Sequence, residues 1–76
     1  MDSNKKHYMI IQKTSGCAFG VYEGATPEEA VEALDIDAGY RSSEDAARSL
    51  KTTVEAMREE LEVRLATSME VIRWTM

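Results

Sequence analysis

The sequence has few of the residues that usually carry catalysis, metal binding or covalent cross-linking. Cys17 is the only cysteine and His7 the only histidine among 76 residues, so we expect neither an internal disulfide nor a cysteine-based metal framework. A single cysteine suits a reducing compartment. No apolar run reaches the roughly 18 residues that would span a bilayer, and the N-terminus lacks the apolar core of a secretory signal. We therefore expect a cytoplasmic protein without a membrane segment.

Basic residues are absent from the middle of the chain, although the composition is otherwise that of an ordinary globular domain. Hydrophobic residues make up 43% and charged residues 30%, and nine basic against fourteen acidic residues give a formal charge of −5. Residues 23–37 include no Lys or Arg but six carboxylates, namely Glu23, Glu28, Glu29, Glu32, Asp35 and Asp37. A chain of this length has room for one small core. We predict a flexible N-terminus over residues 1–6 and a single α+β domain over residues 7–76.

Two short runs rich in aromatic and branched residues, 7–13 and 18–23, predict a β-hairpin that turns at residues 14–16. The expected cross-strand pairs are His7 with Glu23, Met9 with Val21, and Ile11 with Phe19. Because side chains alternate across a strand, the hairpin has two faces. The face expected to carry the core holds Met9, Ile11, Phe19 and Val21. The other face, expected to be exposed, holds Tyr8, Ile10 and Tyr22.

Capping patterns predict short helices after the hairpin. Thr26 can cap a helix that starts at Pro27, with Glu29 completing a capping box. Gly39 is placed to end this helix in a left-handed conformation, and Tyr40 follows it. A second helix is expected from Ser42 or Ser43 with Ala46, Ala47 and Leu50 facing inward, and a third from a capping box of Thr52 and Glu55.

Two interpretations of the C-terminal third remain open. Residues 61–66 fit both the spacing of a helix and the alternation of a strand. Residues 69–76 are a second candidate for a strand. An isolated hairpin is marginal in water, so another strand is needed. We therefore predict an α+β fold in which the hairpin is followed by two or three short helices and a C-terminal strand completes a small antiparallel sheet.

No group of residues in the sequence supports an enzyme or a cofactor site. His7 and Cys17 could in principle form a nucleophilic dyad, but the expected hairpin separates them by about 20 Å. The segment 35–40, DIDAGY, has only the beginning of a calcium-binding loop. We expect a non-enzymatic protein with no catalytic residue, no metal site and no cofactor.

Residues 42–63 resemble a helix-turn-helix, the motif with which many bacterial regulators bind DNA. Lys51 stands in the connection between the two helices, where such motifs usually carry glycine. The helix expected to enter DNA, residues 54–64, carries Glu55, Glu59, Glu60 and Glu62 against Arg58 and Arg64. Contacts of Lys and Arg with phosphates supply much of the affinity in DNA complexes, so this charge distribution disfavours DNA. A DNA-binding regulator or antitoxin is the alternative function.

An acidic stripe is the main candidate for a binding site. It consists of Glu28, Glu32 and Asp35 at helical spacing, with Glu29 and Asp37 beside them. Charged faces are usually only solvated. Here, however, like charges four residues apart destabilise the helix, and no basic residue is interspersed. We therefore predict that the stripe binds a basic protein surface and accelerates association by electrostatic steering.

Residues 13–40, KTSGCAFGVYEGATPEEAVEALDIDAGY, resemble a type of small uncharacterised bacterial and phage-borne protein. The shared features are a hairpin ending in GVYEG, a helix start TPEEA and the ending DAGY. This resemblance implies a structural motif and no activity. In size and acidity alone, the chain is also similar to the anti-CRISPR and anti-restriction inhibitors of mobile elements, some of which occupy nucleic-acid-binding surfaces.

These observations lead us to expect a small acidic inhibitor that docks on a nucleic-acid-binding defence complex. It would bind neither nucleic acid nor membrane directly. Trp74 and Met76 place apolar groups at the end of the chain, where they would leave surface uncovered. A homodimer is therefore expected.

Overall fold

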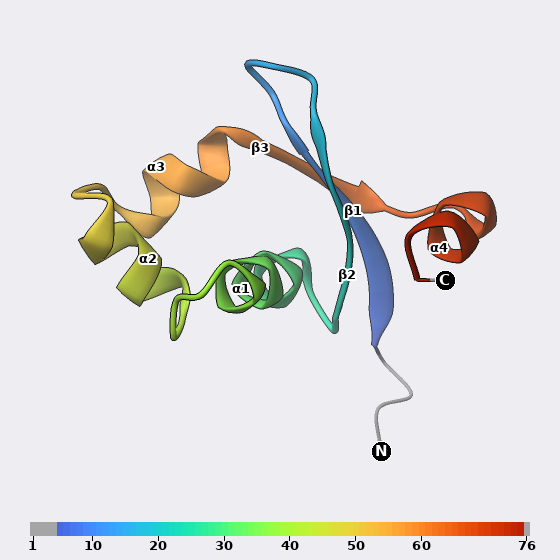
Figure 1. Ribbon diagram of the computed structural model, residues 1–76, viewed down its shortest axis with the longest axis horizontal. Coiled ribbons are helices and arrows are strands. Elements are labelled where there is room, and N and C mark those ends of the chain that lie inside the picture. The colour runs from blue at the N-terminus through green and yellow to red at the C-terminus, as the bar shows by residue number, and fades with distance from the viewer. Residues whose placement is uncertain (1–4, 76) are drawn as a thin grey trace.

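The computed structural model describes residues 5–75, which form one antiparallel sheet and several short helices (Figure 1). In chain order the elements are β1 (Lys6–Gln12), β2 (Ala18–Gly24), α1 (Pro27–Asp37), α2 (Ser43–Ser49), α3 (Val54–Glu59), β3 (Leu61–Leu65) and α4 (Ser68–Thr75). The strand order is β2-β1-β3. The predicted α+β class and the strand that completes the sheet are therefore confirmed. Of the segment expected to be flexible, residues 1–4 lie outside the described part, and β1 already begins at Lys6.

The hairpin has the expected register at its open end and a bulge near its turn. His7 lies opposite Glu23, and Met9 lies opposite Val21, as predicted. Ile10 pairs with Gly20, but Ile11 pairs with Ala18, so the expected pair of Ile11 and Phe19 is wrong. An extra residue on one strand is the definition of a β-bulge. Here that residue is Phe19.

The core lies on the face of the hairpin that was expected to be exposed. Tyr8 and Ile10 are buried against Ala30 and Val31 of α1, and Ile10 is 0% exposed. Phe19, which was expected in the core, is 43% exposed. Both hairpin faces carry apolar residues, so alternation alone could not say which one the helix would cover. Helix α1 packs on the face that carries Tyr8 and Ile10, and this packing determines which face is buried.

The second face of the sheet is covered in part by α4, which lies on the opposite side of the sheet from α1 (Figure 1). Trp74 of α4 packs on β2, since a Cβ added at Gly20 would lie 3.3 Å from Trp74 Cε3. On this face Arg64 of β3 makes a two-pronged ion pair with Glu70 of α4, at 2.9 and 2.7 Å. Met9 is buried next to β3, opposite Arg64.

Helix α1 has both of the predicted ends. Thr26 Oγ1 accepts a hydrogen bond from Glu29 N at 3.2 Å, and Glu29 Oε1 accepts one from Ala25 N at 2.9 Å. Gly39 has a φ of 107°, and the N–H of Tyr40 donates to the carbonyl of Asp35 at 3.0 Å. Side-chain and backbone bonds of this kind satisfy groups that a helix terminus otherwise leaves unpaired.

Helices α2 and α3 form near the predicted positions, with two corrections. Ser42 caps α2, and Ala46 and Ala47 are buried as expected. Leu50 is 58% exposed rather than inward, because α2 ends at Ser49 and the backbone turns before α3. The cap of α3 is Thr53, whose Oγ1 accepts from Ala56 N at 3.1 Å, and not Thr52.

The structure decides between the interpretations of the C-terminal third. Residues 61–65 form the strand β3, whereas residues 68–75 form the helix α4 and not a strand. Thr67 and Glu70 make the capping box that starts α4, since Thr67 Oγ1 accepts from Glu70 N and Glu70 Oε1 accepts from Thr67 N. Branched residues in 69–76 favoured a strand, but the capping box and the ion pair with Arg64 stabilise a helix here.

Candidate functional site

The structure separates the five residues of the acidic stripe. Glu28 and Glu32 are exposed on the side of α1 that faces α2 and α3, and Glu29 lies beside them at the start of the helix. Asp37 lies elsewhere, where its Oδ2 accepts a hydrogen bond of 2.9 Å from the hydroxyl of Tyr22. Burial and this bond to Asp37 raise the pKa of Tyr22. The stripe therefore does not form one continuous solvent-exposed face.

Asp35 is buried, although it continues the helical spacing of the stripe. The residue is only 8% exposed, and its Oδ2 has no hydrogen-bond partner among the residues that the structure describes. Burial raises the pKa of this carboxyl group, Ser43 counteracts the rise by hydrogen bonding, and the charge of Glu32 adds to it. An ionised oxygen without a partner is costly inside a protein.

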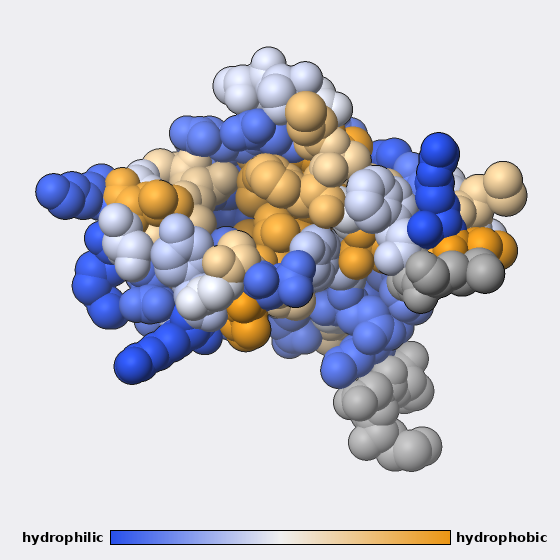
Figure 2. Space-filling view, in the orientation of Figure 1, coloured by the Kyte–Doolittle hydropathy of each residue, from blue (hydrophilic) through white to orange (hydrophobic). Residues whose placement is uncertain are grey.

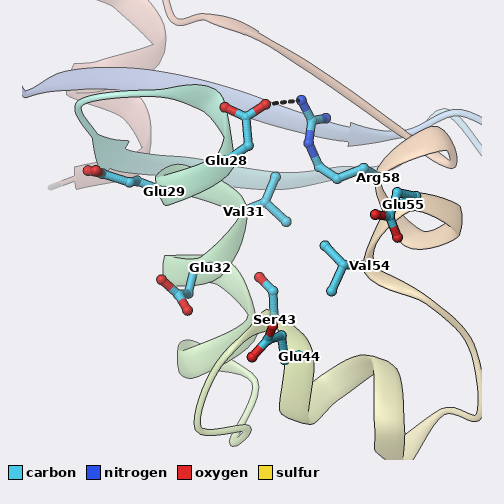
Figure 3. Close-up of a pocket in the computed structure, with 9 residues that line it drawn as sticks. All are labelled: Glu28, Glu29, Val31, Glu32, Ser43, Glu44, Val54, Glu55 and Arg58. Atoms are coloured by element: carbon cyan, nitrogen blue, oxygen red, sulfur yellow. Dashed lines mark hydrogen bonds and ion pairs between the residues drawn. The ribbon is translucent and has the colours of Figure 1, made fainter.

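Three helices instead assemble a different set of carboxylates around a groove of about 500 Å³ (Figure 3). We call it the acidic groove. Its acidic residues are Glu28, Glu29 and Glu32 from α1, Glu44 from α2 and Glu55 from α3. Val31 and Val54 form its apolar floor, and Ser43 and Arg58 complete the lining. The lining thus contains five carboxylates and one guanidinium.

Arg58 joins α3 to α1 across the acidic groove. Its Nη2 lies 3.5 Å from Glu28 Oε2, and Figure 3 shows this contact as a dashed line. The pKa of Glu28 is lowered first by a hydrogen bond to its own backbone and next by Arg58. An exposed ion pair of this length contributes little to stability. It does reduce the negative charge at one end of the groove, so Glu32, Glu44 and Glu55 carry most of the unpaired charge.

Helix starts explain why acidic residues gather at this groove. Glu28 and Glu29, Glu44, and Glu55 all lie in the first turns of their helices, where the backbone N–H groups and the helix dipole favour negative charge. Only Glu32 lies deeper in a helix. Glu44, Glu55 and Arg58 were not predicted from the sequence as site residues. The caps at Ser42 and Thr53 placed two of them at helix starts, but only tertiary packing brings those starts to α1.

The structure places His7 and Cys17, the candidate nucleophilic pair, at opposite ends of the hairpin. His7 Nε2 lies 3.3 Å from Glu23 Oε2 on the adjacent strand, and Cys17 is exposed at the turn of the hairpin. Within residues 5–75, no three His, Cys, Asp or Glu side chains are close enough together to hold a metal ion. In the same part of the chain, no helix has the length and apolar character needed to cross a membrane.

One geometric feature supports the helix-turn-helix interpretation of residues 42–63, and another argues against it. Lys51, in the connection between α2 and α3, has a φ of 58°, a conformation in which glycine is favoured. However, α3 has only 6 residues and ends at Glu59, so it is shorter than the expected helix over 54–64. Its Glu55 faces the acidic groove. A helix this short, with acidic residues beside it, offers a poor surface to a DNA groove.

Comparison with known proteins gives no match: no protein-family model, curated protein or solved structure is similar to this chain. Function must therefore be argued from the groove itself.

Proposed function

We propose that this chain is a non-enzymatic, cytoplasmic protein-binding module that docks on a basic protein surface through the acidic groove. An inhibitor of the anti-CRISPR or anti-restriction type would act in this way, by covering a surface that otherwise binds nucleic acid. Such a surface is rich in Lys and Arg and complementary to a row of carboxylates.

The convergence of α1, α2 and α3 on one acidic groove supports this proposal most directly. Within residues 5–75, three of its carboxylates, Glu32, Glu44 and Glu55, form no ion pair, and all three are exposed. They are held on helices with fixed caps, so little flexibility would be lost on binding. A rigid negative surface raises the association rate of a positive partner and suppresses encounters with acidic ones.

Two double variants with the same change in charge test the proposal. Glu32→Gln with Glu55→Gln removes charge from the acidic groove, and Glu23→Gln with Glu62→Gln removes the same charge from exposed strand positions. A helical Ala/Lys peptide serves as the basic probe, and stopped-flow fluorescence measures its association. At about 50 mM salt, we expect the groove variant to associate roughly three to ten times more slowly than the control variant.

Salt provides the second criterion for the same experiment. At about 500 mM salt the Debye length falls below about 5 Å, so the difference between the two variants should disappear. Equal rates for both variants at low salt would show that the acidic groove is only a solvated surface.

The alternative is a DNA-binding regulator that uses α2 and α3, and the left-handed turn at Lys51 favours it. A gel-shift assay with unrelated duplex DNA at low salt separates the two functions. We expect no shift, because the acidic residues around α3 repel phosphates. A robust shift that Lys51→Glu abolishes would replace the proposed function by this alternative.

A further inference from the structure

A second groove, of about 250 Å³, lies where the end of α1 and the α2–α3 segment approach the sheet. We call it the apolar groove. Its apolar residues come from five elements or their ends, and they are Phe19, Leu34, Ala38, Leu50, Met57 and Leu61. Figure 2 shows hydrophobic atoms gathered in the middle of the molecule, framed by hydrophilic residues of the surrounding helices. Of the residues that the structure describes, no Lys or Arg lines this groove.

The walls of the apolar groove remain in contact with water. Leu50 is 58% exposed and Phe19 is 43% exposed, and no residue of α3 is fully buried. The free energy of a complex falls when a partner covers exposed apolar surface, and a concave apolar surface can hold a side chain. The groove therefore has the shape and the chemistry to receive an apolar group from another molecule.

Asp35 adds a charge to the lining of the same groove. Its carboxyl group is buried, and Oδ2 has no hydrogen-bond partner in the described part of the chain. Glu60 is the other carboxylate of the lining. A donor supplied by a ligand would satisfy Asp35 Oδ2, and a cationic donor would also balance its charge. The apolar walls and the buried carboxyl group of Asp35 together indicate a ligand that carries an apolar group next to a cationic group.

We propose that the apolar groove receives an apolar side chain from a basic amphipathic helix of the partner protein, while a Lys or Arg of that helix pairs with Asp35. This inference rests on the proposed function and adds the chemistry of the partner to it. Helices that dock in grooves insert apolar side chains at positions i, i+3, i+4 and i+7, and their other positions are free to carry charge.

Charge complementarity favours such a helix over a second copy of this chain. The formal charge is −5, so repulsion opposes the docking of a second copy at this acidic surface, whereas a basic helix is attracted to Asp35, Glu60 and the acidic groove nearby. Ser43 lines the acidic groove and stabilises the ionised form of Asp35 by hydrogen bonding. Helix α1 lines both grooves, with Glu32 in the acidic groove and Asp35 in the apolar groove, so one basic helix lying along α1 can contact both.

The test compares two peptide probes of equal charge on the full chain. One is a Leu/Lys peptide with leucines at i, i+3, i+4 and i+7, and the other replaces those leucines by alanine. Leu50→Gln removes an apolar wall from the groove, and Ile72→Gln on α4 is the matched control, because these side chains are 58% and 56% exposed. Fluorescence anisotropy measures affinity, and circular dichroism verifies folding.

We expect the wild-type chain to bind the Leu/Lys peptide about tenfold more tightly than the Ala/Lys peptide. Leu50→Gln should reduce this preference to about twofold or less, and Ile72→Gln should leave it unchanged. Asp35→Asn should weaken binding of the Leu/Lys peptide roughly threefold or more, whereas Asp37→Asn, whose carboxyl group accepts from Tyr22, should not.

Four results would overturn the inference. Equal affinity for the two peptides would show that the apolar groove does not bind the leucine side chains. The acidic groove would then remain as the binding site. A preference lost in Ile72→Gln but kept in Leu50→Gln would move the apolar contact to α4. Sedimentation that shows a wild-type dimer and a Leu50→Gln monomer would make a second copy of the chain the occupant. If neither peptide binds at low salt, the proposed function fails together with this inference.

Discussion

The half of the molecule built from β1, β2 and α1 buries its apolar side chains, whereas the α2–α3 segment leaves many of them at the surface. Ile10 and Val31 are almost completely buried where α1 crosses the sheet. In the α2–α3 segment only Ala46 and Ala47 are buried, and Leu50 is exposed. Small alanines allow α2 to approach its neighbours, but they contribute little apolar area. The first half therefore carries most of the stability, and the second half leaves apolar surface exposed.

This division also explains the positions of the two grooves. Both lie between α1 and the α2–α3 segment, which is held to the rest of the domain by few large side chains and by the exposed pair of Glu28 and Arg58. Segments with few buried apolar contacts open at a lower free energy than the core. A partner that fills the grooves would stabilise this segment through mass action.

The largest expected effect is a difference in the free energy of unfolding between two substitutions, one in each half of the molecule. Ile10→Ala removes a side chain with 0% exposure and should reduce the free energy of unfolding by roughly 2–5 kcal/mol. Leu50→Ala in the α2–α3 segment, at 58% exposure, should change it by about 0.5 kcal/mol or less. Urea unfolding followed by circular dichroism measures both. Similar losses for the two variants would contradict the division into a packed and an open half.

A smaller effect on stability is expected at α4, because polar contacts hold this helix to the sheet. Hydrogen bonds from Arg64, and next from the backbone of Thr67, lower the pKa of Glu70 to about 2. A lowered carboxyl pKa means that the group stabilises the fold above its ordinary pKa, and that this contribution is lost as pH falls from about 4.5 toward 2. Glu70→Gln should therefore lower the melting temperature at pH 7, and the difference from wild type should shrink at acidic pH.

Trp74, the only tryptophan, provides a local readout for this variant. Its fluorescence reports on α4, where it packs against Gly20, and circular dichroism reports on the whole domain. Loss of the Trp74 signal before the global transition would show that α4 detaches first. The matched variant Glu62→Gln, whose carboxylate lies 4.0 Å from Arg64, should have little effect.

The smallest effect is expected at Asp35, where burial raises the carboxyl pKa. A raised pKa means that ionisation is unfavourable in the folded state, so the charge destabilises the fold at pH 7; this penalty shrinks as the pH falls through the raised pKa and is gone below the ordinary value of 3.8. Asp35→Asn should therefore stabilise the protein slightly at pH 7 and not at acidic pH. A lower melting temperature for Asp35→Asn at pH 7 would show that the hydrogen bond from Ser43 to the ionised carboxylate outweighs the cost of its burial.

The sequence by itself determined the local elements of this protein. The bonds that define them are short-range, as in the caps at Thr26, Ser42 and Gly39 and in the hairpin register at His7 and Met9. The capping box of Thr67 and Glu70 is equally short-range, but it was missed, because the branched residues beside it favoured a strand. Five acidic residues were also predicted as a site, and three of them, Glu28, Glu29 and Glu32, line the acidic groove.

Only the tertiary structure decided which faces are buried and which carboxylates meet. The bulge at Phe19 and the packing of α1 put Ile10 in the core, although both faces of the hairpin carried apolar residues. The same packing buried Asp35 and brought Glu44 and Glu55, which lie 12 and 23 residues after Glu32 in the sequence, to α1. Such contacts depend on how whole elements fit together, and the periodicity of a single element contains no information on its neighbours.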